Sequence, residues 1–274
     1  MKEFKSFYKS VGGNEGGKCK YPTRLDTYGC GCQHDCSYCY AKSLLEFRGL
    51  WDAQEPSVAS LGKLERKINR LEPGSIVRMG GMTDCFQPLE KRYRVTAGVI
   101  KMLNKRGVGY LIVTKSDLVC DYMHILDKRL AHVQISTTWL PCEHAVSTER
   151  RIRAVETLQA AGYDVAVRLS PYIPQYVDFD QLNAIKCDKV VVEFLRVNHW
   201  VRRWLPMMDF SEYTVKQSGY LHLPLEKKVE YLSRVTGFDQ LSVCEDVTAH
   251  YDYWRENVNY NKGDCCNLRR GLVH

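Results

Sequence analysis

Residues 32–40 read Cys-Gln-His-Asp-Cys-Ser-Tyr-Cys-Tyr, a run that places three cysteines within eight positions. The spacing C-x3-C-x2-C lets one short loop present three thiolates to a single inorganic group. A 4Fe–4S cluster has four corners, so Cys32, Cys36 and Cys39 as ligands would leave one iron open. Because an open metal position is where chemistry takes place, the spacing predicts a reactive iron–sulfur centre.

Two other interpretations of this loop are weaker. A structural zinc ion needs a fourth ligand near the loop, for which only His34 and Cys30 are available. The zinc interpretation would make the protein a non-catalytic nucleic-acid-binding protein. A disulfide is typical of short secreted chains, whereas this chain has 274 residues.

The composition indicates a globular chain with a basic surface. Hydrophobic residues make up 45% of the chain and charged residues 26%, which is enough to bury an ordinary core. We find no run of about 18 apolar residues that predicts a membrane span and no signal-peptide pattern at the start. Twelve cysteines without an export signal predict a cytoplasmic location. The net charge of +7 suits an anionic partner such as nucleic acid.

Strand and helix patterns alternate along most of the chain. We expect strands at 21–28, 75–79, 110–114, 133–137, 164–169 and 189–195, and helices at 41–47, 57–71, 91–106, 118–130, 147–161 and 178–185. This alternation predicts parallel strands with helices outside them. Right-handed crossovers would curl such a sheet into a complete or an incomplete barrel.

Polar or small residues stand at the carboxyl ends of these strands. Parallel barrels carry their active sites at this end. Small residues let the backbone approach a ligand, while lysine, arginine and serine can hold a carboxylate or a ribose. Alternatively, any one of these residues could merely form hydrogen bonds with neighbouring backbone groups. In chain order, the candidates are Gly80, Gly81, Thr83, Asp84, Lys115, Ser136, Arg168 and Ser170.

The loop and these strand ends resemble the radical S-adenosylmethionine superfamily. The resemblance implies a partial (β/α)6 barrel and a 4Fe–4S cluster on the three loop cysteines. It further implies that S-adenosylmethionine binds the open iron and is cleaved reductively to a 5′-deoxyadenosyl radical. The strand-end candidates would line this cofactor, with Asp84 accepting from its ammonium group. A flavodoxin or ferredoxin would serve as the electron donor.

Further motifs are similar to the branch of this superfamily related to spore photoproduct lyase. The motifs are residues 28–30, 38–41, 82–84, 87–90, 114–116 and 168–171. This likeness implies a lyase or a related modifying enzyme of nucleic acid, with Tyr38 and Tyr40 as the tyrosines that relay the radical. The branch uses a cysteine as hydrogen donor. Met82 occupies about that position here, so Cys85 is the nearest candidate.

Residues 198–204 read Asn-His-Trp-Val-Arg-Arg-Trp and suit stacking on bases and binding to phosphates. An amphipathic segment that covers the barrel end explains the same pattern. We expect a nucleic-acid substrate, with a peptide as the main alternative. Three parts are expected: a flexible arm at 1–20, the barrel at 21–205, and a C-terminal extension packed on the barrel at 206–274.

Three cysteines of the expected extension form a separate group. Cys244, Cys265 and Cys266 can ligate a second cluster or a zinc ion, with His250 as a further ligand. However, adjacent cysteines point apart, so the sequence favours free thiols.

Overall fold

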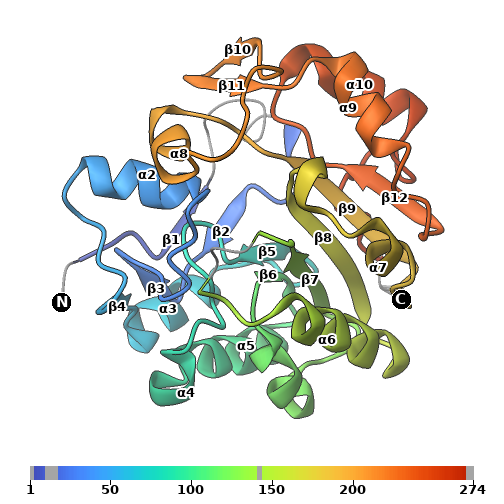
Figure 1. Cartoon of the computed structure of the whole chain (residues 1–274). Coiled ribbons are helices and arrows are strands. Elements are labelled where there is room, and N and C mark those ends of the chain that lie inside the picture. Colours follow the sequence, from blue (N-terminus) through green and yellow to red (C-terminus); the bar gives the residue numbers. More distant parts are fainter. Residues whose placement is uncertain (1–2, 10–17, 141–143, 270–274) are drawn as a thin grey trace.

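The computed structural model describes residues 3–9, 18–140 and 144–269, and Figure 1 shows their course. A mostly parallel sheet lies at the centre, with the order β1-β2-β5-β6-β7-β8-β9-β12 in the described residues. Its strands are β1 (Phe7–Lys9), β2 (Thr23–Leu25), β5 (Ile76–Met79), β6 (Gly109–Thr114), β7 (Ala131–Thr137), β8 (Asp164–Tyr172), β9 (Lys189–Phe194) and β12 (Gln240–Val243). From β2 to β9 neighbouring strands pair in parallel. The order has two ends, so the barrel is incomplete, and the predicted α/β partial barrel is confirmed.

Helices surround this sheet on the outside (Figure 1). They are α2 (Tyr40–Phe47), α3 (Leu61–Ile68), α4 (Glu90–Tyr93), α5 (Val95–Arg106), α6 (Thr148–Ala160), α7 (Phe179–Asn183), α8 (His199–Trp204), α9 (Leu225–Leu232) and α10 (Thr248–Asn257), with 3₁₀ segments at η1 (Asp117–Ile125) and η2 (Pro174–Tyr176). Two small pairs complete the described elements: β3 (Tyr28–Gly29) with β4 (Ser57–Val58), and β10 (Val215–Gln217) with β11 (Tyr220–His222).

The strands form because their residues are apolar on both faces, as expected when helices cover one face and the barrel interior the other. Every residue of β7 is buried, and β9 is buried at five of its six positions. The register pairs Ser136 with Arg168, which brings polar positions of β7 and β8 side by side.

Three predicted helices differ in detail from the structure. The helix expected at 57–71 begins only at Leu61, because residues 57–58 pair with β3 instead. The helix expected at 91–106 is divided into α4 and α5 at Arg94, whose φ of 52° is left-handed. The segment expected as a helix at 118–130 is the 3₁₀ segment η1.

The arm expected at 1–20 contributes to the sheet. Residues 7–9 pair antiparallel with β2, so β1 forms one edge of the sheet. The glycine-rich residues 12–17 lie outside the described part of the chain.

The C-terminal part also belongs to this sheet. β12 pairs in parallel with β9, beyond the strand that we expected to be the last of the series. After α10 the chain returns beneath the amino ends of the strands, where Asp164 accepts hydrogen bonds from Lys189 (2.6 Å) and from the backbone of Arg269 (2.7 Å). Lys189 also donates to the carbonyl of Asn267. This segment closes the floor of the barrel. No helix in the described residues is long and apolar enough to cross a membrane.

Candidate active site

The cysteine loop has a backbone shape that its glycine makes possible. Gly31 has a φ of 154°, and a Cβ there would lie 1.7 Å from the carbonyl oxygen of Asp52. Only glycine allows this approach. Short turns follow, in which the amide of Asp35 donates to Cys32 O (3.0 Å) and that of Cys39 donates to Cys36 O (3.2 Å).

The three loop thiols face one cavity. Cys32, Cys36 and Cys39 all line it, together with Gly80, Gly81 and Lys115 among others. Burial raises the pKa of Cys32 and that of Cys39, so an unliganded thiol stays protonated here. Cys39 also caps α2, because its sulfur accepts from the amide of Lys42 (3.4 Å). These free thiols on one cavity fit a cluster held at three corners.

The turn after β5 is held by a buried carboxylate. Asp26 Oδ1 accepts from the amides of Gly81 (2.8 Å) and Met82 (3.2 Å). Tyr8 on β1 donates to the other oxygen of Asp26 (3.0 Å). Gly80 and Gly81 therefore line the cavity in a fixed conformation, and strand β1 takes part in fixing it.

Asp84 lies at the cavity with both carboxylate oxygens occupied. Oδ1 accepts from Thr114 (2.7 Å) and from the amide of Phe86, while Oδ2 accepts from the amide of Lys115 (2.6 Å). His34 Nε2 lies 3.2 Å from the same Oδ2. Burial acts to raise the pKa of Asp84, but the hydrogen bond from His34 and the others outweigh it and lower the pKa. Asp84 thus ties the cysteine loop to the end of β6.

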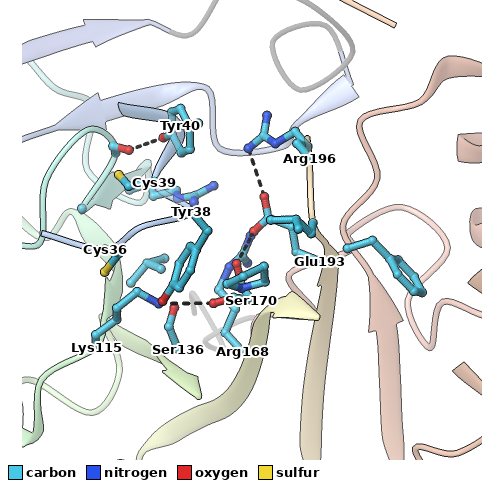
Figure 2. A pocket seen from close by; sticks show the side chains of 17 residues that line it. Cys36, Tyr38, Cys39, Tyr40, Lys115, Ser136, Arg168, Ser170, Glu193 and Arg196 are labelled. Carbon is cyan, nitrogen blue, oxygen red and sulfur yellow. Dashed lines mark hydrogen bonds and ion pairs between the residues drawn. The ribbon is translucent and has the colours of Figure 1, made fainter. Parts of the chain in front are cut away.

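Lys115 directly follows β6, and Ser136 lies near the end of β7. Both line the cavity of the loop thiols and a second cavity that adjoins it, and we call the two together the two parts of the pocket. The Lys115 ammonium group lies 5.0 Å from the centre of the Tyr38 ring and donates to the carbonyl of Ser170 (3.2 Å). Tyr38 lines the pocket, and its buried hydroxyl has no hydrogen-bond partner among the described residues. Figure 2 shows Lys115, Tyr38 and Ser136 close together on this wall.

A network around Glu193 forms the other wall (Figure 2). Glu193 Oε2 accepts from Arg168 (2.6 Å) and from the Ser170 hydroxyl (2.8 Å), and Oε1 accepts from Arg196 (3.2 Å). Arg168 also donates to Gln134 (2.8 Å) and is 1% exposed. Burial acts to raise the pKa of Glu193, but the charge of Arg168 outweighs it and lowers the pKa.

Tyr40 forms the rim of the pocket. Its hydroxyl donates to the carbonyl of Gly81, and the Arg196 guanidinium lies 4.8 Å from its ring centre. Arg196 in turn forms an ion pair with Asp246 from the C-terminal part (2.9 Å). The rim therefore joins the cysteine loop to the C-terminal part.

Two other expected site residues point elsewhere. Thr83 lines the cavity but donates to the carbonyl of Tyr28 (2.6 Å). Cys85 is 1% exposed within the hydrophobic core and lines neither part of the pocket, whereas Met82 lines the cavity. The geometry therefore gives Cys85 no access to a ligand in the pocket.

The predicted Trp/Arg segment is helix α8, which lies beside α2 (Figure 1). Asn198 donates to Ser43 of α2 (3.2 Å), and Lys42 of α2 lies 4.9 Å from the ring of Trp204. The rings of Trp200 and Trp204 are 5.8 Å apart. The segment thus stands next to the helix that follows the cysteine loop.

Sequence reasoning missed three site residues: Asp26, Glu193 and Arg196. Asp26 stands directly after β2, inside the segment that we expected to be a strand, where an acid among buried residues was a usable signal. Glu193 was the one acid within a valine-rich strand, and such a residue must face a polar interior.

Comparison with solved structures decides the fold family. A spore photoproduct lyase complexed with dinucleoside spore photoproduct aligns at a TM-score of 0.60 and 16% identity over 82% of this chain and 77% of that chain. This chain has the fold of spore photoproduct lyase. A double mutant of the lyase with bound AdoMet and dinucleoside spore photoproduct gives a TM-score of 0.55 at 18% identity over the same shares. The expected resemblance to the lyase branch is thereby confirmed for the fold.

Sequence comparison finds relatives without an assigned activity. An uncharacterized protein of Methanocaldococcus jannaschii is 29% identical over 166 residues, and one of Mycobacterium tuberculosis is 27% identical over 169 residues. These alignments cover 56% and 54% of this chain. They span only 61% and 49% of the two relatives. No protein-family model matches the chain.

Proposed function

We propose that this protein is a radical S-adenosylmethionine enzyme that modifies or repairs nucleic acid. The observation that carries the proposal is the shared cavity, which three loop thiols, a glycine turn and the half-buried Lys115 all line. The likeness to the lyase fold supports it.

Cys32, Cys36 and Cys39 would hold a 4Fe–4S cluster, and the cavity beside them would receive S-adenosylmethionine. When bound, the cluster supplies the electron that cleaves S-adenosylmethionine to a 5′-deoxyadenosyl radical. The protein contributes position and the exclusion of water.

We propose that some pocket residues contact the cofactor and that others hold those residues in place. Gly80, Gly81, Lys115 and Ser136 line both parts of the pocket and are proposed to contact the cofactor. Asp84 is proposed as a positioning residue, since its oxygens already accept from the protein. Arg168 and Ser170 are proposed to act through Glu193, which they hold at the pocket wall.

Tyr38 and Tyr40 are the proposed residues for handling the radical. Tyr38 presents a buried hydroxyl that no described residue satisfies, and such a group gains a partner when a ligand binds. Tyr40 stands at the rim. Apart from Cys32, Cys36 and Cys39, no described cysteine lines the pocket, so a lyase step that needs a hydrogen-donating cysteine has no support from the geometry.

Nucleic acid is the proposed substrate class for three reasons. The net charge is +7, α8 carries exposed Arg202 and Arg203 beside two neighbouring tryptophans with tilted rings, and the lyase structure is complexed with dinucleoside spore photoproduct. The position of α8 beside α2 would put a bound strand close to the pocket. A peptide is the alternative substrate.

We also propose a cytoplasmic location and an electron donor of the flavodoxin or ferredoxin kind. Every described cysteine is a free thiol, which suits a reducing compartment.

The decisive experiment is cofactor cleavage by enzyme purified without oxygen and reduced with dithionite. We expect slow conversion of S-adenosylmethionine to 5′-deoxyadenosine and methionine in the absence of substrate. Cys36→Ala should abolish it, whereas Cys187→Ala, a buried thiol away from the pocket, should not. A protein that contains zinc, lacks iron and produces no 5′-deoxyadenosine would instead be the non-catalytic zinc protein.

A further inference from the structure

Four cysteines from three distant segments meet at the floor of the barrel. We call them the floor cysteines: Cys19, Cys244, Cys265 and Cys266. The Cys265 thiol lies close enough to those of Cys244 and Cys266 to interact with both, and Cys19 lies near enough to interact electrostatically with the same two. Cys19 precedes β2, while Cys244 follows β12 directly.

The scaffold fixes the backbone on which these thiols stand. The amide of Cys244 donates to Val192 O (2.8 Å), and that of Cys266 donates to Asp264 (3.0 Å). Tyr21, two residues after Cys19, donates to the same Asp264. Cys265 and Cys266 pack with Leu111 of β6 inside the barrel. The convergence is therefore built by the fold.

Buried arginines surround the floor cysteines. Arg24 donates to Cys19 Sγ (3.8 Å), while Arg78 and Arg168 lie near enough to Cys266 for their charges to act on it. All three arginines are at most 7% exposed. Glu193 offsets part of their charge on the pocket side, and Asp264 part of it below. A negatively charged sulfur group would add a favourable interaction with these buried cations.

We propose that the floor cysteines ligate a second iron–sulfur cluster, on the opposite side of the Arg168–Glu193 layer from the pocket. Tetrathiolate sites select iron–sulfur clusters or zinc. Within the described residues, neither this group nor the loop cysteines is arranged around a single ion. Because the loop cysteines of the same chain are the proposed ligands of an iron–sulfur cluster, we assign iron and not zinc to the floor cysteines.

The fourth ligand is Cys19 and not His250. His250 Nδ1 lies 3.3 Å from the ammonium group of Lys228 and 3.7 Å from Glu245, within a separate buried ion-pair group. Cluster binding would replace four S–H protons by four Fe–S bonds, so no electron is transferred in the step. From the sequence alone, the adjacency of Cys265 and Cys266 favoured free thiols. The fold outweighs that argument, because it brings Cys19 and Cys244 to the same place.

The test is the iron content of a variant without the loop ligands, Cys32→Ala/Cys36→Ala/Cys39→Ala. Wild-type protein reconstituted without oxygen should contain about eight irons per chain, and this variant about four, with brown colour retained. Adding Cys265→Ser and Cys266→Ser should remove the remaining iron and colour. Adding Cys187→Ser instead should leave both unchanged.

The outcomes separate this inference from the proposed function. A loop variant that keeps its helical circular dichroism but holds no iron would overturn the second cluster. One zinc per chain in the loop variant, lost with Cys265→Ser and Cys266→Ser, would also overturn it. In both cases wild-type protein would still cleave S-adenosylmethionine if the proposed function is correct.

Discussion

Lys115 places its ammonium group 5.0 Å from the centre of the Tyr38 ring. The contact joins the end of β6 to the cysteine loop across the pocket. Burial lowers the pKa of Lys115 to about 8, although the nearby Cys36 acts in the opposite direction. A buried cation of this kind gains most when an anionic ligand group arrives, as the carboxylate of S-adenosylmethionine would.

Lys115→Ala should therefore weaken the binding of S-adenosylmethionine. The lost charge-assisted contact corresponds to about 1.5–3 kcal/mol of binding free energy. Calorimetric titration of reconstituted enzyme without oxygen measures it. The matched control is Lys101→Ala, which removes an exposed lysine of α5. Equal affinity of both variants and wild type would contradict the assignment of Lys115.

Tyr38→Phe should separate radical formation from turnover. The change removes only a hydroxyl that no described residue satisfies, so the free energy of unfolding should stay within about 1 kcal/mol of wild type. Cleavage of S-adenosylmethionine without substrate should continue, while product formation should fall. Tyr122→Phe, a core tyrosine outside the pocket, is the control. Unchanged product formation in Tyr38→Phe would rule out a catalytic role.

Glu193→Gln should destabilise the fold strongly. The buried Arg168 would lose its ion pair, and removing one partner of such a pair costs on the order of 3 kcal/mol. Ser170→Ala removes only one hydrogen bond to the same carboxylate and should cost about 1 kcal/mol. Chemical denaturation of the three proteins measures both values. If both variants lose the same free energy of unfolding, the ion pair between Glu193 and Arg168 contributes nothing to stability.

Most of the pocket could be predicted from sequence because parallel strands bring their carboxyl ends to one edge. That rule identified Gly80, Gly81, Lys115 and Ser136 as pocket residues. It could not show that the oxygens of Asp84 are occupied, because His34 and Thr114 reach it only in the folded chain. Cys85 was misplaced for a related reason: chain proximity to the turn does not determine which way a side chain points.

Arg202→Ala/Arg203→Ala should lower the affinity for nucleic acid and flatten its dependence on salt. Each lost phosphate contact removes a released counterion, so the slope of log K against log salt should fall by about 2. Trp200→Ala should cost a further ~1–3 kcal/mol if a base stacks there. Binding to labelled DNA and RNA oligonucleotides over a salt series measures this.

The matched control for that experiment is Arg66→Ala/Arg70→Ala, which removes the same charge from α3 and its C-terminal end, where both residues are exposed. If both pairs change binding equally, only net charge matters. Wild-type protein without any salt-dependent binding would remove nucleic acid as the substrate and leave a peptide.

Asp164→Asn should lower the free energy of unfolding at neutral pH. In acid, the variant and wild type should become equally stable. Burial acts to raise the pKa of Asp164, but hydrogen bonds from His132 and Lys189 outweigh it and lower the pKa to about 2. A carboxyl with a lowered pKa stabilises the fold above its unfolded pKa, and this contribution disappears as pH falls towards 2. The difference should be about 2 kcal/mol at pH 7.

Urea unfolding of wild type and Asp164→Asn at pH 7 and at about pH 3 checks this prediction. Any cluster lost in acid is lost from both proteins, so their difference isolates the carboxyl. A difference that stays the same at both pH values would contradict it.

The floor of the barrel shows where sequence reasoning ends. Alternating strand and helix patterns predicted β5 to β9, because these segments have their periodicity within the chain. Nothing local predicted that residues 264–269 return beneath β7 and β8, since this depends on contacts such as Lys189 with Asn267. The convergence of Cys19 with the C-terminal cysteines is a product of this tertiary route.

The pairing of β12 with β9 affects how the protein can be engineered. Exchanging residues 206–269 for those of a relative would replace a strand of the central sheet, the Asp246 partner of Arg196 and the floor contacts of Asp164. A chimera joined at 205 would thus combine two incomplete halves of one hydrophobic core. Surface changes on α8, the proposed contact for nucleic acid, would leave that core intact.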